Sequence, residues 1–256
     1  MRKIISLANQ KGGVGKTTTA INLGASLAAC ERRVLLIDLD PQANATSGVG
    51  IGKNEEKTMY NVLTEGMKLK EVIRETELPT FYIAPSGVDL VGAELELSDA
   101  IGREFHLRRA LQDVNGDFDY ILIDSPPSLG LLTINGLTAA NSVVVPMQCE
   151  YFALEGISQL VNTIDRVRDL LNPGLDIEGI VLTMYDDRMN LSRQVAEEVR
   201  SHFGPKVYET IIPRNVRLGE APSFGKPIIL YDIRSRGSEA YISLAKEIIQ
   251  RAETVI

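Results

Sequence analysis

Short runs of consecutive apolar residues alternate along the chain with longer stretches in which apolar residues recur at helical spacing. Runs with few polar breaks are typical of strands buried on both faces of a parallel sheet, and the longer stretches are typical of amphipathic helices. The pattern predicts strands at residues 4–7, 33–39, 81–84, 120–124, 142–147, 177–184 and 207–212. It predicts helices from about residue 16, then at 59–63, 69–73, 90–97, 104–114, 135–140, 154–171, 195–203 and 238–252.

This alternation of strands and helices indicates an α/β fold, with a mostly parallel, twisted sheet covered by helices on both faces. The chain shows no internal repeat, low-complexity tract or convincing linker. We therefore expect residues 1–256 to form a single domain.

Composition narrows the function classes. Apolar residues make up 44% of the chain, which is enough for one core, and no stretch approaches the roughly 20 apolar residues of a membrane span. The first predicted strand begins at once, so we expect no signal peptide and a cytoplasmic location. The two cysteines lie far apart and match no metal-binding spacing. The net charge of −7 argues against DNA binding unless basic residues gather locally.

Candidate chemistry begins in residues 3–19, K-I-I-S-L-A-N-Q-K-G-G-V-G-K-T-T-T, where a strand, a glycine-rich loop, Lys-Thr and a helix follow one another. This order is typical of a P-loop NTPase, because glycines let backbone N–H groups surround a polyphosphate at a helix N-terminus. Lys16 is expected to contact the β- and γ-phosphates, and the Thr17 hydroxyl to bind Mg²⁺. The predicted nucleotide-binding residues here are Lys11, Gly12, Gly13, Val14, Gly15, Lys16, Thr17 and Thr18.

Aspartates end two other predicted strands. Asp38 and Asp40 follow the strand at 33–39, and Asp124 ends the apolar run at 120–124. Ligands of open parallel sheets bind outside the strand carboxyl ends, so these carboxylates are candidate site residues. Asp124 fits a Walker B residue that holds Mg²⁺. Asp40 precedes Pro41 and could instead open a turn.

The loop also departs from the general pattern G-x-x-x-x-G-K-[ST]. Gln10 stands where that pattern has glycine, and Lys11 is an additional lysine. In K-G-G-V-G-K-T the chain resembles the deviant Walker A motif of the ParA/MinD family of dimerising ATPases. The resemblance implies that Lys11 crosses to the partner subunit's phosphates, as an arginine finger would. The alternative is a solvated loop lysine.

The resemblance implies further roles. Asp40 would orient the attacking water, and Asp38 would support Mg²⁺ or the loop that follows it. Pro213 and Asn215, in I-P-R-N-V-R-L, would lie at the adenine ring. The segment S-P-P-S-L-G after Asp124 is similar to a second switch, and the predicted helix 154–171, after Q-C-E-Y-F-A-L-E-G, would contribute to a dimer face.

Similarity to the chromosomal ParA group, often called Soj, extends over nearly the whole chain. Arg188 and Arg217 match its positions for DNA binding without sequence preference, and Lys226 lies in the same basic stretch. Ordinary surface arginines are the alternative. The resemblance implies a chromosome-segregation ATPase, weak alone, that binds ATP and Mg²⁺, forms a homodimer and becomes nucleoid-associated on double-stranded DNA. A ParB/Spo0J-type centromere-binding protein would stimulate hydrolysis and release the dimer.

Two other functions stay open. A MinD-like positioning ATPase would act on a membrane or a protein cargo, but acidic residues interrupt the apolar stripe of the last predicted helix, so we expect no membrane binding. A regulatory module would hold nucleotide with negligible turnover.

Overall fold

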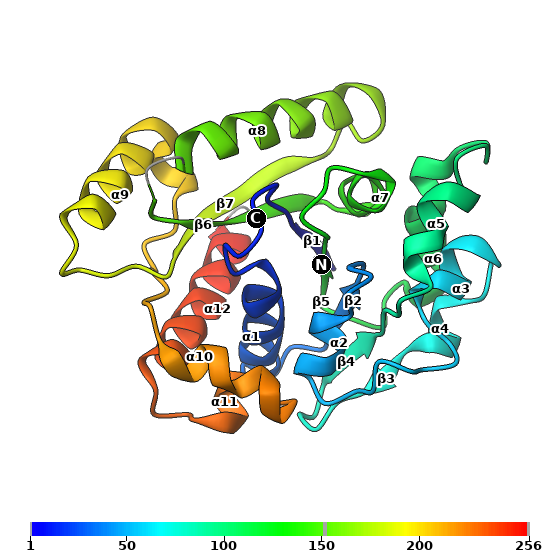
Figure 1. Ribbon diagram of the computed structural model, residues 1–256, viewed down its shortest axis with the longest axis horizontal. Helices are drawn as coiled ribbons and strands as arrows, with labels where there is room; N and C mark the ends of the chain where they lie inside the picture. Colours follow the sequence, from blue (N-terminus) through cyan, green and yellow to red (C-terminus); the bar gives the residue numbers. More distant parts are fainter. Residues whose placement is uncertain (1, 151–152, 255–256) are drawn as a thin grey trace.

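A computed structural model describes residues 2–150 and 153–254. Its centre is a seven-stranded sheet in the order β3-β4-β2-β5-β1-β6-β7 (Figure 1). Neighbouring strands are parallel except for β3 and β4, which confirms the predicted mostly parallel sheet. The strands are β1 (Lys3–Leu7), β2 (Val34–Asp38), β3 (Arg74–Glu75), β4 (Phe81–Ala84), β5 (Tyr120–Asp124), β6 (Ser142–Gln148) and β7 (Asp176–Thr183).

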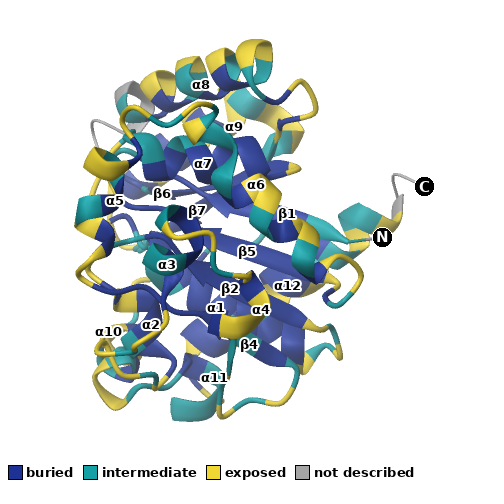
Figure 2. Ribbon diagram, turned by 90° about the vertical axis from the view of Figure 1, so that its right-hand side faces the viewer, coloured by how far each residue is buried: buried dark blue, intermediate teal, exposed yellow. Residues whose placement is uncertain are grey.

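Helices cover both faces of the sheet, as predicted (Figure 2). One face carries α1 (Lys16–Ala29), α2 (Asn44–Gly48), α10 (Val216–Glu220), α11 (Ile228–Tyr231) and α12 (Arg236–Thr254). The other carries α3 (Met59–Thr64), α4 (Leu69–Val72), α5 (Leu90–Glu96), α6 (His106–Ala110), α7 (Leu131–Ala139), α8 (Ala153–Leu170) and α9 (Asn190–Phe203). Among the described residues, no helix combines the length and apolar character needed to cross a bilayer.

Alternate residues of each central strand enter different cores, which explains the unbroken apolar runs. In β2, Leu35 and Ile37 pack in the core beneath α3 to α9, whereas Val34 and Leu36 pack against α1 and α12. All four side chains are fully buried. A strand between two helical layers has no solvent face and therefore needs no polar positions.

One predicted strand is wrong. Residues 207–212 run beside β7 but form no continuous ladder with it. Isolated bridges join Ile180 to Val207 and, beyond the end of β7, Tyr185 to Pro213, and Ile212 N donates to Leu182 O at 2.8 Å. Between the bridges, the backbone N–H groups of Glu209 and Thr210 donate to the carboxylate of Glu247 on α12, at 2.9 and 3.0 Å. A side chain thus takes the place of the strand partner. The antiparallel β3 was not predicted, because two residues make no periodic pattern.

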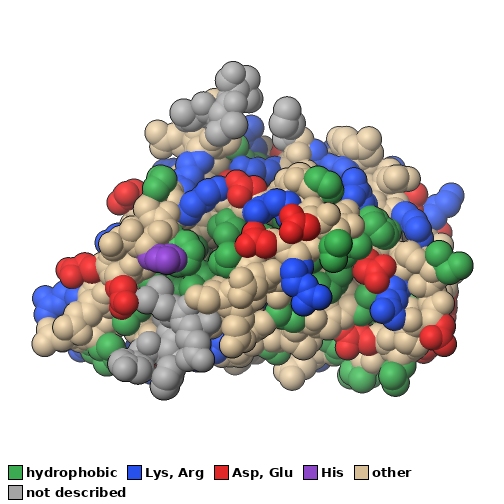
Figure 3. All heavy atoms as spheres, turned by 90° about the horizontal axis from the view of Figure 1, so that it is seen from above, with side chains coloured by type: hydrophobic (Ala, Val, Ile, Leu, Met, Phe, Trp, Pro, Cys, Tyr) green, Lys and Arg blue, Asp and Glu red, His purple; other side chains and the backbone are tan. Residues whose placement is uncertain are grey.

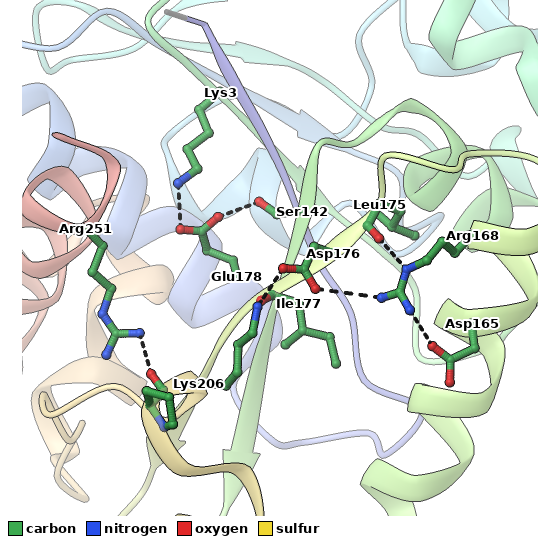
Figure 4. A network of polar contacts seen from close by, with 11 residues as sticks. Lys3, Ser142, Asp165, Arg168, Leu175, Asp176, Ile177, Glu178, Lys206 and Arg251 are labelled. Atoms are coloured by element: carbon green, nitrogen blue, oxygen red, sulfur yellow. Dashed lines mark hydrogen bonds and ion pairs between the residues drawn. The ribbon is translucent and has the colours of Figure 1, made fainter. Parts of the chain in front are cut away.

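Polar contacts join the strands at the amino edge of the sheet (Figure 4). Glu178 of β7 accepts from the Lys3 ammonium at 2.6 Å and from the Ser142 hydroxyl at 2.7 Å. Lys206 donates to Asp176, the first residue of β7, at 2.6 Å. The candidate site residues lie at the opposite, carboxyl edge, so the stabilising ion pairs and the expected chemistry occupy different ends of the same strands.

Candidate functional site

The loop between β1 and α1 has the conformation expected of a phosphate-binding loop. Gly13 and Gly15 have φ values of 75° and 86°, in the left-handed region that favours glycine, and Gly15 is the N-cap of α1. A Cβ atom built on Gly12 or Gly13 would meet nothing within 4 Å. The outer side of the loop is therefore open to a ligand, in front of the unpaired N–H groups of the helix.

Two hydrogen bonds attach this loop to the sheet, and a third lies within the loop. The Asn9 amide donates to Pro146 O at 2.8 Å and accepts from Lys11 N at 3.1 Å, while the Thr183 hydroxyl donates to Val14 O at 2.8 Å. Sequence reasoning assigned no role to Asn9 or Thr183. Their positions in the sequence could have identified them, since each is a polar residue at the carboxyl end of a predicted strand.

Lys16 is a buried cation that forms no ion pair with any residue described by the structure. It is 7% exposed, and its ammonium donates a 3.3 Å hydrogen bond to Lys11 O. Burial lowers the pKa of Lys16, and the carboxylates of Asp124 and Asp40 oppose that change. A desolvated ammonium at the mouth of an open glycine loop favours an anion as its next partner.

Asp38 and Asp124 lie side by side because β2 and β5 pair in parallel with these residues in register. Both are fully buried, and burial raises the pKa of each carboxyl group. Their surroundings differ. Asp38 accepts from the backbone N–H and the hydroxyl of Thr46, at 2.8 and 2.7 Å, and from Asp40 N at 3.1 Å. Asp38 therefore holds the loop 39–46, through a threonine that sequence reasoning missed.

Neither carboxylate oxygen of Asp124 has a hydrogen-bond partner among the described residues. Thr17 and Lys16 lie close enough to oppose the rise in the pKa of Asp124, but the Thr17 hydroxyl stays outside hydrogen-bond geometry. Buried, unpartnered carboxylate oxygens fit a cation ligand, because burying them without a partner is costly. The described residues contain no group of three acidic, histidine or cysteine side chains that could hold a cation by themselves.

Asp40 is half-buried at the start of the loop. One of its carboxylate oxygens accepts from Gln42 N at 2.9 Å, which is the turn that Asp40-Pro41 predicted. The electrostatic effects of Asp40 on Lys16 and on Asp124 bring it into the same site. The turn thus orients the Asp40 carboxylate, and the second carboxylate oxygen remains available to a ligand.

Lys11 is half-exposed, with 41% of its side chain accessible, and forms an ion pair with Glu150 just after β6. It lies on the outer side of the loop, whereas Lys16 is buried behind it. Sequence reasoning gave Glu150 no role. Tyr151 and Phe152, in the segment expected to lead into a dimer face, lie outside the described residues.

The expected adenine-binding residues follow the end of β7. Met184 lies 3.8 Å from where a Gly15 Cβ would be, and its neighbour Tyr185 pairs with Pro213. The Asn215 side-chain oxygen accepts from Arg217 N at 2.8 Å and caps α10, so its NH₂ group remains as a donor. Through these successive contacts, Pro213 and Asn215 lie beside the glycine loop.

The three residues expected to contact DNA do not form one cluster of free charges. Arg188 pairs with Asp186 at 2.7 Å, Arg217 with Glu220 at 2.9 Å, and Lys226 with Glu77 at 2.9 Å. Arg188 is also part of a surface hollow of about 980 Å³ beside Tyr185 and Pro213. Arg214 and Arg236 line this hollow too, and neither forms an ion pair with a described residue.

Comparison with known proteins agrees with this geometry. A family described as an AAA domain matches residues 2–177. The chain is 56% identical to the chromosome partitioning protein ParA of Caulobacter vibrioides, over 97% of this chain and 94% of the relative. It is 58% identical to the sporulation initiation inhibitor protein Soj of Bacillus subtilis, over 97% and 98%.

Two solved structures show the same fold. A Mycobacterium smegmatis protein described as cobyrinic acid a,c-diamide synthase, with bound ADP and magnesium, is 37% identical over 100% of this chain and 97% of its own, with a TM-score of 0.88. The septum site-determining protein MinD of Pyrococcus horikoshii, complexed with Mg-ADP, is 27% identical over 98% of both chains, with a TM-score of 0.83.

Proposed function

The chain belongs to the ParA/Soj family of chromosome-partitioning ATPases, and from this premise we propose that residues 1–256 act as one ATP-dependent dimerising switch. In the ATP state it binds double-stranded DNA without sequence preference, and a ParB-type partner stimulates hydrolysis and releases it. One observation carries the proposal: Asp124 lies in register with Asp38, and Asp38 accepts from Asp40 N, at the sheet edge where Lys16 lies behind a glycine loop whose outer side is open.

The proposed nucleotide site uses groups that keep hydrogen-bonding capacity for a ligand in this fold. The loop N–H groups and Lys16 hold the phosphates, and Pro213 and the Asn215 amide hold the adenine. Thr17 and Asp124 would hold Mg²⁺, which when bound neutralises charge on the phosphates. Asp38, whose oxygens already accept from Thr46 and Asp40, supports the loop. Asp40 orients the attacking water with the oxygen that the turn leaves free.

Gly12 supports the dimer. Its backbone φ is not in the left-handed region, and a Cβ there would meet nothing within 4 Å, so no contact within one chain requires glycine. Close approach of a second copy provides a reason for it. Lys11, exposed next to it, then reaches the nucleotide of the partner subunit.

The change Gly12→Val tests the dimer. Two branched side chains at the contact are expected to prevent closure, while ATP still binds. The monomer should keep its fold, because a Cβ at Gly12 meets no atom of its own chain within 4 Å. Light scattering after gel filtration with ATP measures the mass, and a fluorescent ATP analogue measures binding. Gly52→Val, at another glycine with open surroundings and a φ outside the left-handed region, is the matched control for a stability change. A Gly12→Val dimer with ATP would refute the proposed contact.

The DNA surface is best supported at the hollow. Its lining carries three arginines, Arg188, Arg214 and Arg236, and three acidic residues, Asp186, Asp187 and Glu239, so the charges balance. The support comes from Arg214 and Arg236, which form no ion pair with a described residue. Arg214 N donates to Tyr185 O at 2.9 Å, so this surface is continuous with the segment of Pro213 and Asn215. On the face that Figure 3 shows, charges of the two signs are interspersed, which leaves little net attraction for DNA there.

Arg214 and Arg236 therefore carry a second prediction. Replacing both with alanine is expected to weaken ATP-dependent DNA binding and to lower the salt slope by about 1.8 per subunit, since each phosphate that is no longer neutralised removes about 0.9. Fluorescence anisotropy of a labelled duplex over a salt series measures the slope. Lys57→Ala removes an exposed charge outside the hollow and serves as control. An unchanged salt slope in the double variant would exclude the hollow as the DNA-binding surface.

A further inference from the structure

The outward side of α5 is an exposed apolar surface with no packing partner among the described residues. Val88, Val91 and Leu95 are 70%, 65% and 79% exposed, and Ile101 in the following turn is 97% exposed. Positions 88, 91 and 95 recur at helical spacing and so share one side. The residues of α5 and its next turn that pack inward are Leu90, Ala93 and Leu97. Four of the ten large exposed apolar side chains described lie in this stretch, and such a cluster typically marks an interaction site.

The charges beside this surface select the chemistry of its partner. Residues 88–101 contain Asp89, Glu94, Glu96 and Asp99 and no lysine or arginine. Arg103 borders the far end, where it donates to Ser98 O and pairs with Glu104. An acidic, apolar surface repels DNA phosphates and anionic lipid headgroups, and it attracts a basic segment with apolar side chains.

Glu94 connects this surface to the nucleotide site. Its carboxylate accepts from Leu132 N at 3.3 Å, in the first turn of α7. It also fills the space that a side chain on Gly130 would need, since a Cβ there would lie 2.1 Å from the Glu94 oxygen. α5 and α7 are neighbours in Figure 1. The segment 125–130 that joins Asp124 to α7 is therefore held in place from α5.

We propose that this α5 surface, defined as Val88, Val91 and Leu95 with Asp89 and Asp99, binds a basic amphipathic segment of the protein that stimulates hydrolysis. Binding moves α5, and Glu94 passes the movement to the segment 125–130 beside Asp124. The inference rests on the proposed function and adds to it the binding site of the activator.

The test uses the full chain with ATP and duplex DNA, and a labelled synthetic peptide with the basic amino-terminal sequence of the ParB-type protein from the same genome. The double change Val91→Ser with Leu95→Ser is expected to weaken peptide binding by about tenfold or more and to abolish stimulation. Asp89→Lys with Asp99→Lys is expected to act alike. Leu170→Ser, at a 75% exposed leucine on α8, should change neither. Glu94→Ala should keep peptide affinity and lose stimulation.

The outcomes separate this inference from the proposed function. Wild-type peptide affinity in the Val91, Leu95 double variant would overturn the inference, and so would a wild type that hydrolyses ATP and retains DNA but does not bind the peptide. A wild type without ATP hydrolysis or ATP-dependent DNA retention would overturn the proposed function instead. Unchanged basal hydrolysis in the surface variants shows that they are folded.

Discussion

Replacing Lys11 with alanine is expected to lower the partner-stimulated rate of ATP hydrolysis by about 10³-fold or more, the scale of losing an arginine finger. The proposed dimer places this ammonium where negative charge develops on the partner subunit's nucleotide. Lys16 stays in place behind the loop, so ATP binding should be nearly unchanged. Loss of both binding and hydrolysis would instead make Lys11 an ordinary ligand of its own subunit's nucleotide.

Single-turnover phosphate release, with ATP affinity measured in parallel, tests this prediction. Glu150→Gln is the informative companion, since it frees Lys11 without removing it. Both partners of this ion pair are more than 40% exposed, so it contributes at most about 1 kcal/mol. Glu150→Gln should therefore favour the ATP dimer by no more than about fivefold. Unchanged hydrolysis in Lys11→Ala would refute the proposal that Lys11 contacts the nucleotide bound to the partner subunit.

Replacing Asp124 with asparagine is expected to stabilise the ligand-free protein while abolishing its response to Mg²⁺ with nucleotide. The carboxylate is fully buried and neither oxygen is hydrogen-bonded, so its charge opposes folding until a cation arrives. Removing that charge should raise the melting temperature by about 2–4 °C for each kcal/mol gained. Hydrolysis should fall to background.

Calorimetric melting with and without Mg²⁺ and ATP measures both effects. Asp38→Asn is the matched control, because it sits next to Asp124 in the adjacent strand but accepts three hydrogen bonds. That variant is expected to lose stability, as Thr46 and Asp40 lose part of their acceptor. A lower melting temperature for ligand-free Asp124→Asn would contradict the interpretation that the Asp124 carboxylate is a ligand for a cation.

The sequence predicted the sheet well where strands were buried on both faces. The runs at 33–39 and 120–124 formed β2 and β5, and their terminal aspartates came together as parallel strand ends require. Prediction failed where a side chain from a distant element replaced a backbone partner. Residues 207–212 have a strand's pattern, but Glu247 accepts from the N–H groups of Glu209 and Thr210, and no local signal reveals a partner on α12.

The same limit applies to the site. The glycine loop and its lysine are a local pattern, and the structure has the backbone that the pattern predicts. The contrast between Asp38 and Asp124 is not local, since it depends on where Thr46 folds back. Likewise, the sequence indicated Arg188, Arg217 and Lys226 as cations, but it could not show that each is in an ion pair, whereas Arg214 and Arg236 form none with a described residue.

Whether ATP switches on DNA binding is tested by measuring retention of duplex DNA with ATP, with ADP and without nucleotide. The wild type and Asp40→Ala are compared. We expect the wild type to bind DNA with ATP and not with ADP. Asp40→Ala should bind DNA equally or more strongly with ATP, because that variant keeps the phosphate loop but cannot orient water. Absence of DNA binding in every nucleotide state would contradict the segregation switch, and retention on liposomes instead would indicate a membrane-positioning ATPase.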